Sequence, residues 1–248
     1  RDVERSRGLG DVYKRQVDDS ALGEDVVKKL KNHKVNTDYV MTMPGGMGTW
    51  LAVFDHNGDL AGSISQRPNL MPILGLLEEK GDEIFANADS VIVEVDMDKD
   101  IIKKVVALAK QYNKKLYGVV SNMSIAVERR DFLKHFDCFI CNQLEAGMLF
   151  MEDYADKSPE ELRDILSKRV ILGKIPAMIV TMGGNGAVYA DVNGEKGICP
   201  PQRVRVKDTT GAGDAFCAGV ASGLTYGKKL SEAVEIGSRL AASVITSS

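Results

Sequence analysis

The segment from Asp208 to Asp214 combines a glycine-rich turn with a carboxylate. Small residues in the turn let the backbone approach a ligand closely. The run of small residues that follows can begin a helix, and the first N–H groups of that helix would point toward an anion. The helix dipole would keep Asp214 ionised at this end. The segment therefore predicts a phosphate site in which Asp214 acts as a general base on a nearby hydroxyl group.

The same spacing has a purely structural interpretation. A glycine-rich turn before a helix also allows the helix to pack closely on a sheet. In that case Ala215, Gly219 and Ser222 would form the flat face of the helix. Both interpretations fit the spacing.

Residues 208–219 resemble the C-terminal motif of the ribokinase-like (PfkB) carbohydrate and nucleoside kinases. The resemblance implies that Asp214 deprotonates the acceptor hydroxyl group. It also implies that Asp208 and Thr210 bind a monovalent cation such as K⁺. The amides of the turn would bind the migrating phosphoryl group, and they belong to Gly211, Ala212 and Gly213.

A second segment of chemical interest is the pair Asn142 and Glu145. It follows the apolar run 139–141, which is typical of a buried strand. Sheets of α/β proteins bind ligands at the carboxyl ends of their strands. The spacing resembles the Asn-x-x-Glu motif of the same family, in which Glu145 would orient the water shell of Mg²⁺ and Asn142 would assist. The alternative is an ordinary helix cap.

A third segment joins the apolar runs 179–181 and 187–189 through a glycine-rich turn, which predicts strand, turn and strand. A tight hairpin would explain it without a ligand. The family places an ATP-contacting Thr-x-Gly here, which matches Thr181 and Gly183, and Gly186 lies in the same turn. With its motifs in this order, the resemblance runs from about Val17 to the end of the chain.

The first sixteen residues lie outside the resemblance. Residues 6–16 correspond to the in-frame translation of a transposase-based sequencing-library adapter, so we interpret residues 1–16 as not native. The alternative is an ordinary disordered basic arm. Residues 17–23 resemble a segment that lies well inside a complete kinase, and the last predicted helix is followed by no stop signal. We therefore expect residues 17–248 to be an incomplete ribokinase-like domain.

Composition excludes several classes of protein. The chain has 248 residues and a formal net charge of −3, which argues against a nucleic-acid partner. It contains no apolar run long enough to span a bilayer and no signal peptide in its native part, so we expect a cytoplasmic enzyme. Cys138 and Cys141 have the spacing of half a zinc site. Residues three apart in a strand face opposite sides, which favours buried packing cysteines.

The apolar pattern alternates between strands and helices. This succession predicts an α/β fold with a central, mostly parallel sheet. The resemblance implies that this fold is a ribokinase-like three-layer sandwich. Residues 50–54 and 60–64 flank Asn57-Gly58, which predicts a hairpin in a small β lid over about 38–64. Helices are expected near 20–33, 99–111, 126–135, 158–168 and 230–245, and strands near 38–42, 90–95, 116–120 and 138–141.

The predicted activity is transfer of the γ-phosphoryl group of ATP, with Mg²⁺, to a primary hydroxyl group of a sugar or a nucleoside. Residues 241–248 resemble pseudouridine kinases slightly more than ribokinases, and Thr49, Trp50 and Asn122 are candidates for the acceptor side. We expect no nucleic-acid or membrane partner, and the resemblance is compatible with a homodimer formed through the lid. The chain as it stands is expected to have little activity, because the family's acceptor-binding aspartate is not among its residues.

Two other classes of function remain open at this point. One is a relative that binds nucleotides or sugars without catalysis. The other is a Rossmann-type oxidoreductase, against which the lack of a Gly-x-Gly-x-x-Gly segment between a strand and a helix argues.

Overall fold

The computed structural model describes residues 16–54, 60–120, 127–207 and 209–247. The chain divides into two compact units, residues 1–80 and 81–248. Helix α2 (Met71–Asn87) runs across the boundary between them. The sequence showed no linker there, because a continuous helix carries none of the usual signals of a domain boundary.

The first unit contains two small sheets. Strand β1 (Gln16–Val17) pairs in parallel with β2 (Met41–Thr42), and α1 (Ala21–Asn32) lies between them in the sequence. Strands β3 (Thr49–Phe54) and β4 (Leu60–Gln66) form an antiparallel pair. The predicted hairpin is therefore confirmed, although its turn lies outside the described residues. Because β2 pairs with β1, the predicted lid range of 38–64 includes strands of two different sheets.

Gln16, the last residue of the predicted adapter segment, begins β1. Its side chain is only 4% exposed, and its Nε2 donates a hydrogen bond to the carbonyl oxygen of Asn69. The described end of that segment is thus packed within the first unit. Residues 1–15 lie outside the described residues.

A six-stranded sheet forms the centre of the second unit, in the order β10-β9-β8-β7-β6-β5. Strands β5 to β8 are parallel, while β8, β9 and β10 are joined by antiparallel pairs. The predicted parallel sheet is confirmed for four strands, and so is the strand-turn-strand segment that becomes β8 and β9. The strands are β5 (Ser90–Glu94), β6 (Lys115–Val119), β7 (Cys138–Asn142), β8 (Ala177–Thr181), β9 (Ala187–Asp191) and β10 (Lys196–Cys199).

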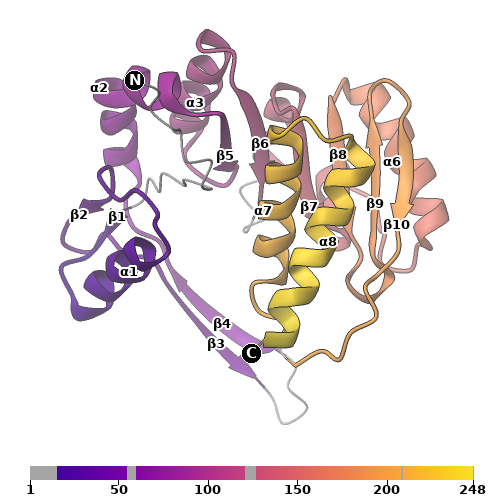
Figure 1. The fold of residues 1–248 in the computed structure, drawn as a ribbon, viewed down its shortest axis with the longest axis horizontal. Coiled ribbons are helices and arrows are strands. Elements are labelled where there is room, and N and C mark those ends of the chain that lie inside the picture. Colours follow the sequence, from indigo (N-terminus) through magenta and orange to yellow (C-terminus); the bar gives the residue numbers. More distant parts are fainter. Residues whose placement is uncertain (1–15, 55–59, 121–126, 208, 248) are drawn as a thin grey trace, which may run out of the picture. The chain divides into compact units, whose positions relative to one another are not determined.

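Helices cover both faces of this sheet. The pair α7 and α8 lies on one face, and α6 lies on the other (Figure 1). The predicted three-layer arrangement is confirmed. No helix among the described residues is long and apolar enough to cross a membrane. The helices are α3 (Lys99–Gln111), α5 (Gln143–Phe150), α6 (Pro159–Gly173), α7 (Ala212–Thr225) and α8 (Leu230–Ser247), with 3₁₀ helices η1 (Val127–His135) and η2 (Gly183–Asn185).

Several boundaries differ from the expectation. The helix predicted at 126–135 is the 3₁₀ helix η1, and α6 continues to Gly173 instead of ending near 168. The short strand β10 and the helices α2 and α5 were not predicted. The helix α3, in contrast, has the predicted bounds, because its buried residues recur at helical spacing.

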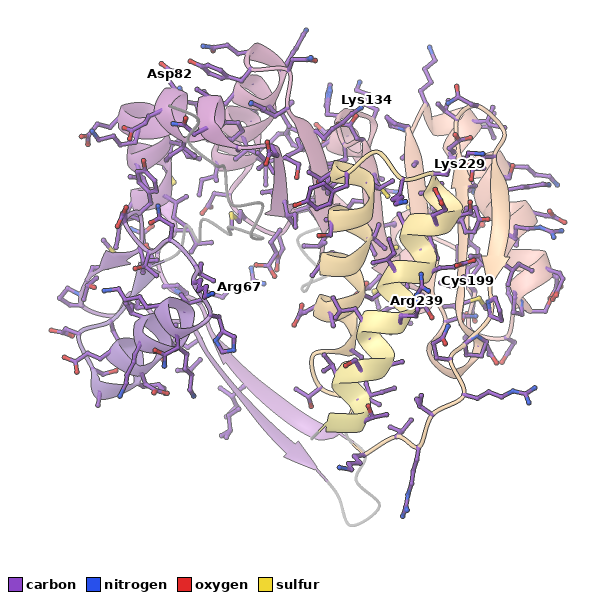
Figure 2. All side chains as sticks on the ribbon, in the orientation of Figure 1. Arg67, Asp82, Lys134, Cys199, Lys229 and Arg239 are labelled. Atoms are coloured by element: carbon purple, nitrogen blue, oxygen red, sulfur yellow. The ribbon has the colours of Figure 1, made fainter. Side chains whose placement is uncertain are left out.

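The core of the second unit is built around β7. Its residues 138–141 are all buried, as a central strand covered on both faces requires. Cys138 and Cys141 are free thiols inside this core, in agreement with the packing interpretation. The described residues contain no cluster of three or more side chains that could hold a metal ion. Cys199, labelled in Figure 2, is a third buried thiol at the end of β10.

Helices α7 and α8 touch through their glycines. A Cβ atom on Gly219 would lie 2.7 Å from the Cα atom of Gly237, and one on Gly237 would lie 2.7 Å from the carbonyl oxygen of Phe216. Gly219 therefore does allow close helix packing, as predicted, but its partner is α8 and not the sheet. This backbone contact fixes where the first turn of α7 lies.

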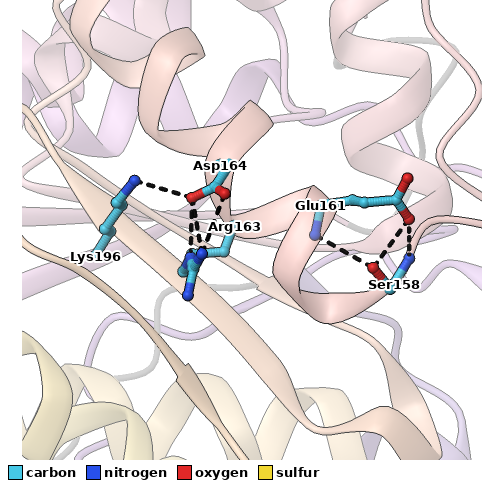
Figure 3. Close-up of polar contacts among 5 residues, drawn as sticks. All are labelled: Ser158, Glu161, Arg163, Asp164 and Lys196. Atoms are coloured by element: carbon cyan, nitrogen blue, oxygen red, sulfur yellow. Dashed lines mark hydrogen bonds and ion pairs between the residues drawn. The ribbon is translucent and has the colours of Figure 1, made fainter.

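Helix α6 is held by local and long-range polar contacts (Figure 3). Ser158 and Glu161 form the predicted capping box at its start. Asp164 accepts from Arg163 and, at 2.9 Å, from Lys196 Nζ of β10. These hydrogen bonds hold the pKa of Asp164 well below its usual range. Since the pair with Lys196 is exposed, it orients α6 on the sheet more than it stabilises the fold.

The glycine contact predicts a clear stability effect. Gly219→Ala and Gly237→Ala should each lower the free energy of unfolding by about 1–3 kcal/mol, because the added methyl group overpacks the contact. Urea denaturation followed by circular dichroism measures this. Gly75→Ala in α2 is the matched control, since a Cβ there meets nothing within 4 Å. It should raise stability by up to about 1 kcal/mol. Equal effects at all three positions would contradict the packing argument.

Candidate active site

Two of the predicted motifs meet at the carboxyl edge of the sheet. Asn142 is the last residue of β7 and Thr181 is the last residue of β8, and the parallel register pairs these two residues directly. The Thr181 hydroxyl group donates to the carbonyl oxygen of Cys141 at 3.5 Å. The sheet therefore brings Asn142 and Thr181 together at the edge where α/β sheets bind ligands.

Asn142 and Glu145 form a complete capping box at the start of α5. The Glu145 backbone N–H donates to Asn142 Oδ1 at 2.8 Å, and the Asn142 backbone N–H donates to Glu145 Oε2 at 2.7 Å. The capping alternative thus describes what these side chains do in the structure. A carboxylate has two oxygens, so the box engages only one of them. Burial raises the pKa of Glu145, and the hydrogen bond from Asn142 partly opposes that shift.

The first turn of α7 has backbone donors without an intrahelical acceptor. Gly211 is the N-cap in the left-handed region, with φ of 77°, which favours glycine. No side chain among the described residues caps this helix. The Ala212 N–H donates to the carbonyl oxygen of Thr209 at 3.1 Å. Of the three amides that the sequence suggested for an anion, that of Ala212 is therefore engaged. The next amides, of Gly213 and Asp214, have no partner within the helix.

Space is available beside this turn. A Cβ atom on Gly213 would meet no atom within 4 Å, and Asp214 is exposed in the first turn. A helix N-terminus with free amides and open space attracts anions. The turn can therefore bind a phosphate, with the carboxylate of Asp214 next to it.

The thiol of Cys217 in α7 is affected by carboxylates from two different helices. It lies three residues after Asp214, on the same face of α7. Burial raises the pKa of the Cys217 thiol to about 12, and the negative charges of Asp214 and Glu145 add to the shift. The charges of a residue in α7 and a residue in α5 therefore both act on this thiol. Sequence reasoning did not include Cys217, although its helical spacing from Asp214 could have indicated it.

The glycines after β8 differ from each other. Gly183 has φ of 54°, and a Cβ there would meet nothing within 4 Å. Gly186 has φ of 86°, and a Cβ there would lie 2.2 Å from the carbonyl oxygen of Cys199. The fold itself requires glycine at 186, whereas Gly183 borders open space.

The structure describes some of the remaining predicted residues and not others. Thr210 is exposed just before the turn, and Asp208 lies outside the described residues. Thr49 and Trp50 belong to β3 in the first unit. Asn122 also lies outside the described residues.

Two cavities occur elsewhere. One of about 460 Å³ lies within the first unit beside α1, and one of about 630 Å³ lies beside α6. None of the candidate site residues lines either cavity. Among the described residues, the candidate site of the second unit is therefore formed by the exposed turn of α7 and the ends of β7 and β8.

A family model described as pfkB family carbohydrate kinase matches residues 15–248. The chain is 35% identical over 239 residues to guanosine-inosine kinase of Exiguobacterium acetylicum, across 93% of this chain and 76% of that protein. It is 24% identical over 223 residues to pseudouridine kinase of Escherichia coli K12, across 86% of this chain and 66% of that protein.

The fold also matches a solved structure. Arabidopsis thaliana ribokinase complexed with ribose and ATP superposes with a TM-score of 0.78 and 19% identity, across 95% of this chain and 76% of that one. This likeness shows the ribokinase-like α/β fold. The family match excludes the Rossmann-type oxidoreductase. The predicted resemblance is confirmed: the chain belongs to the pfkB family of carbohydrate kinases, which are phosphotransferases with a hydroxyl group as acceptor.

Proposed function

We propose that this protein transfers the γ-phosphoryl group of ATP to the primary hydroxyl group of a purine nucleoside. The observation that carries the proposal is the uncapped first turn of α7, which presents free amides and the exposed carboxylate of Asp214 together. The 35% identity to guanosine-inosine kinase supports a nucleoside as the acceptor. The likeness to a ribokinase complexed with ribose and ATP supports ATP as the donor.

The amides of the α7 turn would bind the phosphoryl oxygens of the transferred group. Donors fixed by a helix need no reorganisation when charge develops on those oxygens, which is the main source of electrostatic catalysis. The open space at Gly213 admits the phosphate close to the backbone. The proposed anion-binding amides belong to Gly211, Ala212 and Gly213. The Ala212 amide would exchange its hydrogen bond to Thr209 for one to the ligand.

Asp214 would act as the general base. The acceptor oxygen attacks the γ-phosphorus atom and forms a new P–O bond, while the bond from that phosphorus to the β,γ-bridging oxygen breaks. ADP leaves with the electron pair, and the hydroxyl proton moves to the Asp214 carboxylate. The exposure of Asp214 lets an acceptor reach it, and a carboxylate beside the acceptor hydroxyl group can take up its proton.

Other residues would bind the nucleotide and its cations. Glu145, assisted by Asn142, would hold the water shell of Mg²⁺, which neutralises phosphate charge when bound; a carboxylate oxygen left outside the capping box suits this hard cation. Asp208 and Thr210 would bind a monovalent cation such as K⁺. The last residue of β8 and two glycines of the turn after it would contact ATP, namely Thr181, Gly183 and Gly186.

The acceptor is tested directly by phosphoryl transfer from ATP. Guanosine and inosine should give a kcat/KM at least about tenfold above that of ribose and pseudouridine, because a base contact adds binding energy to the transition state. The assay is run on this chain and, since the match covers 76% of guanosine-inosine kinase, on the complete gene product as well. Preference of the complete product for ribose would overturn the nucleoside proposal and retain the kinase.

Replacement of Asp214 tests the base. Asp214→Asn should lower kcat by about 10²–10⁴-fold while ATP affinity changes little, because Asn cannot accept the proton. Asp100→Asn is the control, since Asp100 is also an acidic residue in the first turn of a helix, α3. It should leave kcat unchanged. An Asp214→Asn variant with undiminished kcat would eliminate Asp214 as the base.

Replacement of Glu145 separates its two roles. Gln is also found in capping boxes, so Glu145→Gln should keep the melting temperature near its original value. The Mg²⁺ concentration for half-maximal activity should rise about 10–100-fold. Glu161→Gln changes the equivalent box of α6 (Figure 3) and should alter neither quantity much. A lower melting temperature with the original Mg²⁺ requirement would show that Glu145 only caps α5.

A further inference from the structure

A short basic segment leads into the α7 turn. Arg203, Arg205 and Lys207 alternate with Val204 and Val206, and every one of these residues is exposed. No carboxylate partner is found for any of the three cationic side chains among the described residues. None of residues 200–207 belongs to a helix or strand.

The segment is fixed next to the candidate phosphate site. The Lys207 backbone N–H donates to the carbonyl oxygen of Ile245 in α8 at 2.9 Å. A Cβ atom on Gly211 would lie 3.8 Å from Val244 Cγ1. The last turns of α8 therefore lie beside both ends of the segment 207–211. Lys207 precedes Gly211 by four residues, a span of at most about 14 Å. That span is comparable with the Debye length of about 10 Å at 0.1 M salt.

The candidate site carries negative charge, and the basic segment 203–207 can offset it. Asp214 and Glu145 place two carboxylates near the turn, and the chain has a formal net charge of −3. A nucleoside triphosphate is an anion and is repelled by both. The dipole of α7 attracts it only within about one helical turn. A positive charge with a longer reach than the helix dipole would attract the triphosphate from farther away.

We infer that Arg203, Arg205 and Lys207 form a cationic strip that attracts the triphosphate of ATP to the first turn of α7. The strip raises the association rate constant of the nucleotide. Exposed charges near a site steer a ligand of opposite charge toward it, and they add little to the stability of the bound complex. This inference rests on the proposed use of ATP and adds the residues that set how fast ATP binds.

The test replaces all three cations by Gln and measures binding of a fluorescent ATP analogue by stopped flow, without acceptor. At about 20 mM salt the association rate constant should fall about tenfold. The difference should nearly disappear at about 0.5 M salt, where the field is screened. The dissociation rate constant and kcat should change less than about twofold. Circular dichroism checks the fold, and the single charge reversal Arg205→Glu provides a second variant.

Lys228 and Lys229 supply the control. They are exposed at the other end of α7, and Lys229 is labelled there in Figure 2. The 14 residues of α7 separate the two ends by about 21 Å, well beyond the Debye length. Replacing both by Gln changes the net charge in the same direction, but should leave the association rate constant unchanged.

The outcomes separate the two proposals. An unchanged association rate in the triple variant, or an equal loss in the Lys228 and Lys229 variant, overturns the cationic strip. An unmodified chain that binds ATP but transfers no phosphoryl group, in the complete gene product as well, overturns the proposed kinase reaction alone. A chain that binds no nucleotide at either salt concentration overturns both.

Discussion

The backbone contact between Gly219 of α7 and Gly237 of α8 is the constraint on which the candidate site depends. Neither glycine has a side chain, so the two backbones approach closely at this point, and Phe216 and Val220 of α7 join the core around β7. The first turn of α7 is thereby held near the end of β7. A bulkier residue at either glycine would move that turn away from the strand ends that complete the site.

The electrostatics of the site follow from this placement. Two carboxylates, Asp214 and Glu145, come close enough to act on the thiol of Cys217. Such a pair is unfavourable unless positive charge is nearby. The free amides of α7 supply part of it through the helix dipole, and the basic residues 203–207 lie just before the turn. The concentration of negative charge is what a site for a cation and a proton acceptor requires.

The two capping boxes show that local geometry does not define function. Asn142 with Glu145 and Ser158 with Glu161 satisfy the same backbone groups in nearly the same way. Only the first stands at the carboxyl edge of the sheet, one strand from Thr181 and close to α7. The same side-chain pair is therefore a simple cap in α6 and a candidate metal-binding and nucleotide-binding pair in α5.

The sequence by itself determined the features whose causes are local: the family motif over 208–219, the periodic helix α3, the capped start of α6 and the buried strand β7. It did not reveal α2, whose proline and glycines obscure its pattern, or β10, a short edge strand that exists through its pairing with β9. Tertiary structure alone decided that Asn142 lies beside Thr181 and that the charge of Glu145 acts on Cys217 of α7. Strand order and helix packing bring together residues far apart in the chain, and no local pattern encodes those contacts.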